Sequence, residues 1–333
     1  MTKNTIEQIA RKAGVHKSTV SRVINNSPNV TISAKTKKKI FDLIRKIGYR
    51  KNILASRFAR GTRELAVITC EDHPRALFNP YHHEIMVHLQ ILLGKTGNYL
   101  IYHQYGPETD RFLDKNIDES MCRGIILLGS RKYKYLEEIG GRVPVLRLLY
   151  PKRNKYESVI LQDRKEEARL LIDYLVKHGR SRILVVMYSR NKLYAELDAV
   201  LCKTAKQYQN LNLSIRYLSD QKDLYLDNLD DVYARYAGGR LLADVKQYDA
   251  VVSMTLDGFR LYLHLLKMGV KMPEDIAYIN FDSVHLTRTL FRDVTTVGID
   301  YQGLAGKVMA FFDEKEKKRV DYILPIIFEG KTA

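Results

Sequence analysis

Apolar residues recur with a helical period at the start of the chain. Four of them follow the spacing i, i+3, i+4, i+7 and share one face of a predicted helix: Ile6, Ile9, Ala10 and Ala13. Thr5, with Gln8 three residues later, fits a capping box that starts this helix. Gly14 is expected to end it, because glycine tolerates the positive φ of a tight turn.

A second short helix is expected after the turn at Gly14 and Val15. Its apolar face consists of Val20, Val23 and Ile24. The other faces carry groups that can hydrogen-bond to phosphates and base edges: Lys17, Ser18, Thr19, Ser21, Arg22 and Asn25. The two stretches together predict a helix-turn-helix, although a solvated polar surface would show the same pattern.

A third helix is predicted from a cap at Ser33 to a stop at Gly48. Its apolar stripe would close a three-helix core: Ile40, Phe41, Ile44 and Ile47. The basic residues of its other face are expected to attract polyanions at long range rather than to read bases. A further short helix fits the stretch from Asn52 to Arg60, and a helix of this length folds only when it packs against something.

From Arg63 onward the pattern changes to short apolar runs separated by helical stretches. Strands are predicted at residues 65–69, 99–103, 124–128, 144–148, 158–161, 182–187, 213–217, 249–253 and 276–280, with a helix at 83–93. This alternation predicts parallel α/β sheets in two doubly wound lobes, with boundaries near residues 162 and 290. A ligand would bind beyond the carboxyl ends of the strands, in the cleft between the lobes.

Charge is concentrated at the N-terminus of the chain. The formal net charge is +17, and the first 63 residues contain 16 Lys and Arg against two acidic residues, Glu7 and Asp42. The other 270 residues contain 39 basic and 36 acidic side chains. Such a concentrated positive field matches the polyanionic surface of double-stranded DNA, which favours the helix-turn-helix interpretation over a solvated surface.

Several classes of protein are disfavoured by the sequence. No apolar run reaches the roughly 18 residues of a membrane span and no signal peptide is recognisable, so we expect a cytoplasmic protein with no membrane partner. Cys70, Cys122 and Cys202 are far apart and are expected to be buried free thiols. The run from His82 to Glu84 lacks metal-ligand spacing, and its histidines are expected to lie on the surface. No phosphate loop or catalytic nucleophile is recognisable, so neither a cofactor nor an enzymatic activity is expected.

The segments TIEQIARKAGVHKSTVSRVIN and GYRKNILASRFARG resemble the DNA-binding domain and hinge helix of the lac-repressor and galactose-repressor (LacI/GalR) family. The resemblance implies that the helix starting at Lys17 lies in the major groove, where Lys17, Ser18 and Arg22 choose the bases. It implies backbone contacts by Thr5, Thr19, Ser21 and Asn25, and a minor-groove hinge helix carrying Asn52, Ala55 and Phe58. Leu is more usual at the position of Phe58, and Pro is common at the position of Lys51.

The remainder of the chain resembles the family's effector-binding core, which is related to type I periplasmic sugar-binding proteins. The resemblance implies effector contacts by Asp282 and Asp257, although Leu256 replaces a usual Asn. The stretch from Leu193 to Thr204 lacks the usual Arg-x-x-Gly clamp for sugar hydroxyls. The other candidates are Phe78 and Tyr81 as an apolar wall, Asp163 ahead of a helix, and Arg131 beside Lys132 and Lys134 for an anionic effector. The alternatives are loop capping for Asp282 and Asp257, core packing for Phe78 and Tyr81, and a solvated loop for the basic residues 131, 132 and 134.

These observations predict a DNA-binding domain at 1–50, a hinge helix at 51–61 and an effector-binding and dimerisation core at 62–333. The expected function is a homodimeric transcription repressor that binds a palindromic operator under control of a small, sugar-like effector. Binding of DNA would fold the hinge helix, and lobe closure would move the two hinges. Two alternatives remain open at this point: a core that binds a protein co-regulator, or an enzyme with a DNA-localising module.

Overall fold

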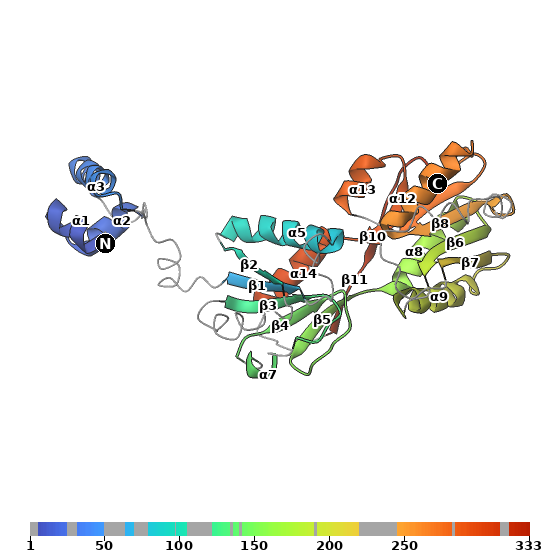
Figure 1. Cartoon of the computed structure of the whole chain (residues 1–333), viewed down its shortest axis with the longest axis horizontal. Coiled ribbons are helices and arrows are strands. Elements are labelled where there is room, and N and C mark those ends of the chain that lie inside the picture. The colour runs from blue at the N-terminus through green and yellow to red at the C-terminus, as the bar shows by residue number, and fades with distance from the viewer. Residues whose placement is uncertain are drawn as a thin grey trace. The chain divides into compact units, whose positions relative to one another are not determined.

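The computed structural model divides the chain into two compact units, Met1–Thr62 and Arg63–Ala333 (Figure 1). It describes residues 6–24, 32–49, 64–69, 79–96, 98–104, 122–133, 136–139, 142–189, 192–219, 245–281, 284–313 and 320–333. The predicted hinge helix, the cap at Thr5 and the site candidates Asn25, Phe78 and Asp282 lie outside these residues.

The described residues of the first unit, 6–24 and 32–49, form three helices, as predicted. Its helices are α1 (Ile6–Ala13), α2 (Lys17–Ile24) and α3 (Ala34–Ile47). Gly14 ends α1 with a φ of 70°, and the Ser33 side chain caps α3 by accepting a hydrogen bond from the Thr36 backbone amide. One apolar core joins the three helices: Ile9, Ala10, Ala13, Val20, Val23 and Ile40. The stops at Gly14 and Gly48 and the cap at Ser33 are therefore confirmed.

One core assignment in α3 was wrong. Phe41 is 44% exposed, whereas Ile40 is completely buried and Leu43 packs against the core. The physical reason is the helical period, since Ile40, Leu43, Ile44 and Ile47 follow the spacing i, i+3, i+4, i+7. Phe41 lies one residue beyond Ile40 and points about 100° away from that stripe.

The second unit contains two six-stranded sheets. The first sheet has the order β11 (Val320–Ile323), β5 (Glu157–Gln162), β4 (Val145–Leu148), β3 (Cys122–Leu128), β1 (Glu64–Thr69) and β2 (Leu100–Gln104). The second has the order β12 (Pro325–Phe328), β10 (Thr295–Ile299), β9 (Ala277–Phe281), β8 (Ala250–Met254), β6 (Arg182–Ser189) and β7 (Asn212–Ser219). Every predicted strand is present, and the pairing is parallel except between β10 and β12.

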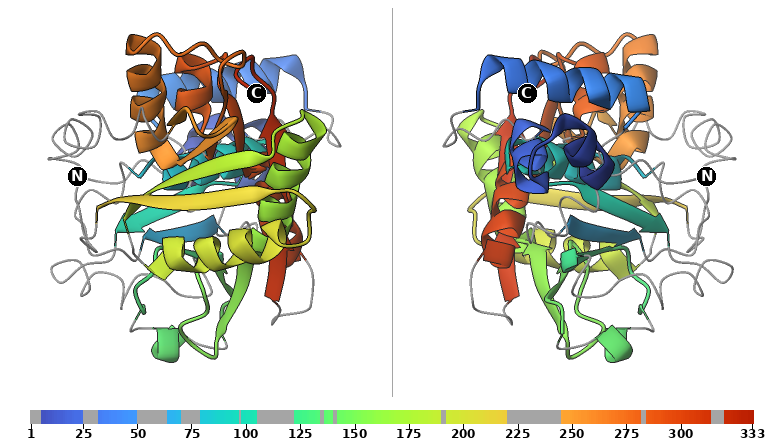
Figure 2. Two further views of the ribbon diagram at one scale, coloured as in Figure 1. Left: turned by 90° about the vertical axis from the view of Figure 1, so that its right-hand side faces the viewer. Right: turned by 90° about the vertical axis from the view of Figure 1, so that its left-hand side faces the viewer.

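Helices cover the sheets and bury their apolar faces. They are α5 (Pro80–Thr96), α7 (Leu136–Ile139), α8 (Arg164–Lys177), α9 (Lys192–Ala205), α12 (Thr255–Lys267), α13 (His285–Leu290) and α14 (Tyr301–Asp313). In β6, Ile183 and Val185 pack with α8 and α9, while Leu184 and Val186 pack with α12 on the opposite face. Helices therefore lie on both faces of the second sheet (Figure 2). Its central strands are buried on both sides, which explains their continuous apolar runs.

The chain changes from one sheet to the other more often than expected. It leaves the first sheet after Gln162, returns after Ile299 to form α14 beside α5, and crosses again between Ile323 and Pro325. The expected boundaries were near residues 162 and 290. The elements β10, β11, β12 and α14 were not predicted, and β11 and β12 have only four residues each, which is too short for a periodic signal. Among the residues that the structure describes, no helix has the length and apolar character needed to cross a membrane.

Candidate functional site

The helix α2 presents its polar side chains on the face opposite its core contacts. Val20 and Val23 are buried, whereas Lys17 and Arg22 are exposed, and Ser18, Thr19 and Ser21 are half-buried. This arrangement leaves the proposed base-reading residues Lys17, Ser18 and Arg22 accessible to a large partner. The proposed backbone-contact residues Thr5 and Asn25, and the hinge residues Asn52, Ala55 and Phe58, fall outside the described part of the chain.

The start of α2 depends on a residue that the sequence reasoning missed, His16. The backbone amides of Thr19 and Val20 donate to the His16 carbonyl oxygen over 2.9 and 3.4 Å. The His16 Nδ1 accepts a hydrogen bond from the Ser18 amide at 3.3 Å and lies 2.9 Å from the Ser18 Oγ. His16 is thus the N-cap of the helix that carries the candidate DNA contacts. Histidine is not a preferred N-cap residue, so composition offered no signal for this role.

Exposed basic side chains are concentrated on α3. Six of them lie on this helix: Lys35, Lys37, Lys38, Lys39, Arg45 and Lys46. Arg45 forms an ion pair with Asp42 at 3.3 Å, and this pair is solvent-exposed on both sides, so it reduces the local positive field only slightly. The first unit therefore combines an accessible hydrogen-bonding helix with an excess of positive charge, which is the combination that a DNA-binding surface requires.

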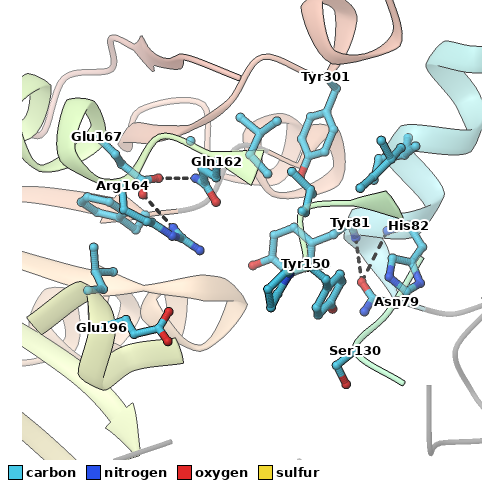
Figure 3. A pocket seen from close by; sticks show the side chains of 18 of the residues that line it. Asn79, Tyr81, His82, Ser130, Tyr150, Gln162, Arg164, Glu167, Glu196 and Tyr301 are labelled. Atoms are coloured by element: carbon cyan, nitrogen blue, oxygen red, sulfur yellow. Dashed lines mark hydrogen bonds and ion pairs between the residues drawn. The ribbon is translucent and has the colours of Figure 1, made fainter. Parts of the chain in front are cut away.

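The second unit contains a cavity of about 470 Å³ (Figure 3), a volume typical of small-molecule sites. Its wall includes residues at or just after the carboxyl ends of β3, β4 and β5 of the first sheet, namely Ser130, Leu149, Tyr150 and Gln162. From the second sheet it includes Met254 and Phe281 at the ends of β8 and β9. The cavity therefore lies at the carboxyl ends of the strands of both sheets, where the sequence analysis expected a cleft.

One end of the cavity is polar. The Arg164 Nη1 donates to the Glu167 Oε2 at 2.7 Å, and the Gln162 Nε2 donates to the Glu167 Oε1 (Figure 3). Glu167 is completely buried, and this burial raises the pKa of its carboxyl group, while the neighbouring Arg164 and Gln162 act in the opposite direction. Glu196 of α9 also lines this end of the cavity. The cluster offers both hydrogen-bond donors and acceptors to a ligand.

The other end of the cavity is aromatic. Tyr81, Tyr150 and Tyr301 line it together with His82 (Figure 3). The Asn79 Oδ1 accepts hydrogen bonds from the backbone amides of Tyr81 at 3.0 Å and His82 at 3.4 Å, which holds the start of α5 in place. Aromatic faces of this kind pack well against the apolar face of a ring-shaped ligand.

His82 corrects an expectation from the sequence. We expected both histidines on the surface, and His83 is exposed, but His82 is only 2% exposed. The reason is that His82 faces the cavity from the first turn of α5. Within the described residues, no group of three His, Cys, Asp or Glu side chains is arranged to bind a metal ion.

The predicted effector-binding residues do not all lie at the cavity. Tyr81 lines the cavity. Asp163 caps α8 by accepting hydrogen bonds from the amides of Lys165 and Glu166, both at 3.1 Å, and lies between two lining residues in the sequence. Arg131 is half-buried beside the lining residue Ser130, and Asp257 belongs to α12. A role in effector binding stays a prediction for all of these residues, and for Phe78 and Asp282.

Sequence reasoning missed most of the polar lining residues. Gln162, Arg164 and Glu167 surround the predicted residue Asp163 at the junction of β5 and α8. A signal for them was available, since polar residues at the carboxyl end of a strand face the ligand site in this architecture. Tyr150 and Arg153 follow β4 in the same way.

Comparison with known proteins identifies relatives of the whole chain. Residues 5–52 match the family described as bacterial regulatory proteins, lacI family. An HTH-type transcriptional regulator of Lachnoclostridium phytofermentans is 26% identical, over 88% of this chain and 87% of the relative. The ribose operon repressor of Lactococcus lactis is 24% identical, over 88% of this chain and 85% of the relative. Both relatives are transcriptional regulators.

A solved structure has the same order of domains along the chain. The crystal structure of the lac repressor dimer bound to operator and the anti-inducer ONPF superposes with a TM-score of 0.69 at 17% identity, covering 99% of each chain. At this level of identity the similarity establishes the fold, a helix-turn-helix domain followed by a two-lobed α/β core.

Proposed function

This chain belongs to the lacI family of bacterial regulatory proteins, and we propose that it is a repressor that binds a near-palindromic operator as a homodimer under control of a small effector. As a member of this family it is a DNA-binding transcriptional regulator rather than an enzyme. The observation that supports operator binding is the exposed polar face of α2. Lys17 and Arg22 are accessible on this face, while Val20 and Val23 are buried on the opposite one.

Operator recognition can be tested without knowing the target genes. Duplexes are selected from a random pool with the full-length protein, and affinity for a selected duplex is measured by fluorescence anisotropy at several salt concentrations. We expect an inverted repeat, because two copies related by a two-fold axis read two half-sites. Affinity should fall steeply with salt, since basic side chains release counterions from the DNA. A selection that yields no inverted repeat, or no preference over scrambled duplex, would contradict the proposal.

Two exposed apolar patches support a homodimer. One lies on α5, where Val87 and Ile91 are exposed one helical turn apart. The other lies on α12 and just after it, where Leu263, Leu266 and Met268 are exposed. Apolar side chains grouped on a surface mark interaction sites, and in a family that reads palindromes a second copy of the chain is the expected partner.

The dimer is tested by placing a charge in the patch on α5. Ile91→Asp should convert the dimer into monomers in sedimentation velocity, because Ile91 is 55% exposed and would be buried between the two copies. Val176→Asp is the matched control, since Val176 of α8 is 42% exposed and belongs to neither patch. Equal behaviour of the two variants would show that α5 is not at the interface.

The cavity supports a ring-shaped, hydroxylated effector. Its aromatic end can pack against an apolar ring face, while Arg164, Glu167 and Gln162 can hydrogen-bond to hydroxyl groups at the other end. The ribose operon repressor is a relative whose description connects it with a sugar operon. We therefore propose a sugar or sugar derivative as the effector.

A thermal-shift screen tests this assignment. Neutral sugars, sugar phosphates and nucleosides are added to the full-length protein, and an effector should raise the melting temperature because it binds only the folded state. The shift should be lost in Arg164→Ala, which removes a donor from the polar end of the cavity. If no compound produces a shift, or if the shift survives unchanged in Arg164→Ala, the cavity is not the site of such a ligand.

A further inference from the structure

A fully buried ion pair lies behind one wall of the cavity. Arg147 of β4 and Glu157 of β5 both have no exposed side-chain surface. The Arg147 Nε donates to the Glu157 Oε2 at 2.8 Å, and the Arg147 Nη2 donates to the Glu157 Oε1 at 2.8 Å. The two side chains therefore form a bidentate pair with a defined orientation across neighbouring strands.

Both members of the pair also bind the loops that form this wall. The Arg147 Nη1 donates to the Gly129 carbonyl oxygen at 2.5 Å, at the start of the loop after β3. The Glu157 Oε2 accepts a hydrogen bond from the Arg153 backbone amide at 2.9 Å, in the loop between β4 and β5. A bond of 3.0 Å from the Arg153 Nε to the Ser130 carbonyl oxygen joins the two loops directly.

These loops carry a continuous part of the cavity lining. The lining residues among them are Ser130, Leu149, Tyr150, Pro151 and Arg153. Leu149 has a φ of 62°, a left-handed conformation that is unfavourable for a leucine and persists only when the surroundings impose it. Its backbone amide donates to the Ile160 carbonyl oxygen at 2.8 Å. The wall is therefore held in a conformation that its own sequence does not prefer.

Stability alone is a poor explanation for such a pair. Removing two charges from water is unfavourable, and replacing a buried ion pair with apolar residues of similar volume is often neutral or stabilising. A pair that is bidentate and also hydrogen-bonds two loops does something that apolar residues cannot do, because it fixes the direction of polar backbone groups.

We propose that Arg147 and Glu157 are positioning residues. They hold one wall of the cavity, made by Ser130 and residues 149–153, in the conformation that binds a ligand. Neither residue lines the cavity, so both act through the loops. The consequence for ligand affinity rests on the proposed effector function, whereas the effect on the loops does not. A preorganised wall lowers the cost of ordering the site when a ligand binds.

The test uses the full-length double variant Arg147→Met/Glu157→Leu, which removes both charges together. Its matched control is Arg123→Met/Asp313→Leu, which removes an ion pair of 2.7 Å in the same lobe that bonds to neither loop. Hydrogen–deuterium exchange is followed for the loop after β3 and the loop between β4 and β5. We expect these amides to exchange at least about ten-fold faster in the double variant only, with the strands β1 and β3 unchanged.

A fluorescent reporter provides a second measurement. The chain contains no tryptophan, so Tyr150→Trp places a single one in the wall. Its quenching by acrylamide should increase when Arg147→Met/Glu157→Leu is added and should not change with the control pair. If the double variant does not fold, the isosteric Glu157→Gln is used, with the same expectation at a smaller magnitude.

The outcomes separate this proposal from the effector proposal. Unchanged loop exchange and quenching would overturn the positioning role, and so would equal acceleration across all strands of the lobe, which would indicate general stabilisation. Where the thermal-shift panel contains a binding sugar, its affinity should fall at least about ten-fold in the double variant. Where no compound in the panel binds, faster loop exchange still supports the positioning role, while the effector assignment fails.

Discussion

The two units of this protein place their functional residues in different ways. In the first unit the candidate base-reading residues Lys17, Ser18 and Arg22 lie on a single helix. The apolar stripe of the same helix packs into the core of the unit. In the second unit the cavity draws side chains from segments as distant in sequence as Asn79 and Tyr301. A site on one element can be read from local periodicity, whereas a site at the ends of many strands depends on sheet topology.

The largest expected effect comes from a charge in the core of the first unit. Ile40→Asp places a carboxylate at a completely buried position of α3, which should cost more than about 3 kcal/mol and unfold this small domain. Affinity for the selected operator should be lost, while thermal unfolding of the α/β core, followed by circular dichroism, should not change. Phe41→Asp is the adjacent control, because Phe41 is 44% exposed. Loss of both unfolding transitions would show that the two units are not independent.

The next effect concerns sequence discrimination by α2. Arg22→Ala should weaken binding to the selected operator by about 1–3 kcal/mol and leave binding to random duplex nearly unchanged, because a base contact distinguishes sequences. Lys37→Ala of α3 should weaken binding to both duplexes alike, as expected for attraction to phosphates. Fluorescence anisotropy on the two duplexes measures both effects. An equal loss on random DNA in Arg22→Ala would remove this residue from the base-reading set.

A smaller effect is expected from the cap of α2. His16→Ala removes the side chain that accepts from the Ser18 amide, and loss of an N-cap costs about 1 kcal/mol of stability. The unfolding temperature of the first unit should fall, with a modest loss of operator affinity. His83→Ala, at an exposed position of α5, is the control and should change neither quantity. If the two variants behave alike, His16 contributes nothing as a cap.

The smallest effect is a pH dependence in the second unit. Burial raises the pKa of the Glu167 carboxyl above its ordinary value of 4.5, so the folded state binds this proton more tightly than the unfolded state. Glu167 therefore contributes to a loss of stability as the pH rises from 4.5 through the raised pKa. Glu167→Gln should remove this contribution and make the unfolding temperature of the α/β core less dependent on pH. Identical pH profiles would show that Arg164 and Gln162 compensate the burial fully.

Prediction from the sequence succeeded where the signal was local. The helices of the first unit, the stops at Gly14 and Gly48 and the cap at Ser33 were all predicted, since each depends on residues within one or two turns. The strands β1 to β9 were predicted, whereas β10 was missed although all five of its residues are buried, as in β8 and β9. The helix α14 was missed although Tyr301, Leu304, Ala305 and Val308 follow the helical spacing i, i+3, i+4, i+7.

The sequence alone determined the fold class, the position of the basic helix-turn-helix and the succession of strands and helices, because periodicity, caps and charge are properties of neighbouring residues. Only the tertiary structure decided that the chain crosses between the sheets once more at Leu324, and that His82 is buried. It also decided that Arg147 and Glu157 meet behind the wall of the cavity. These features depend on which distant segments become neighbours, and that information is spread over the packing of the whole lobe rather than held in any one stretch.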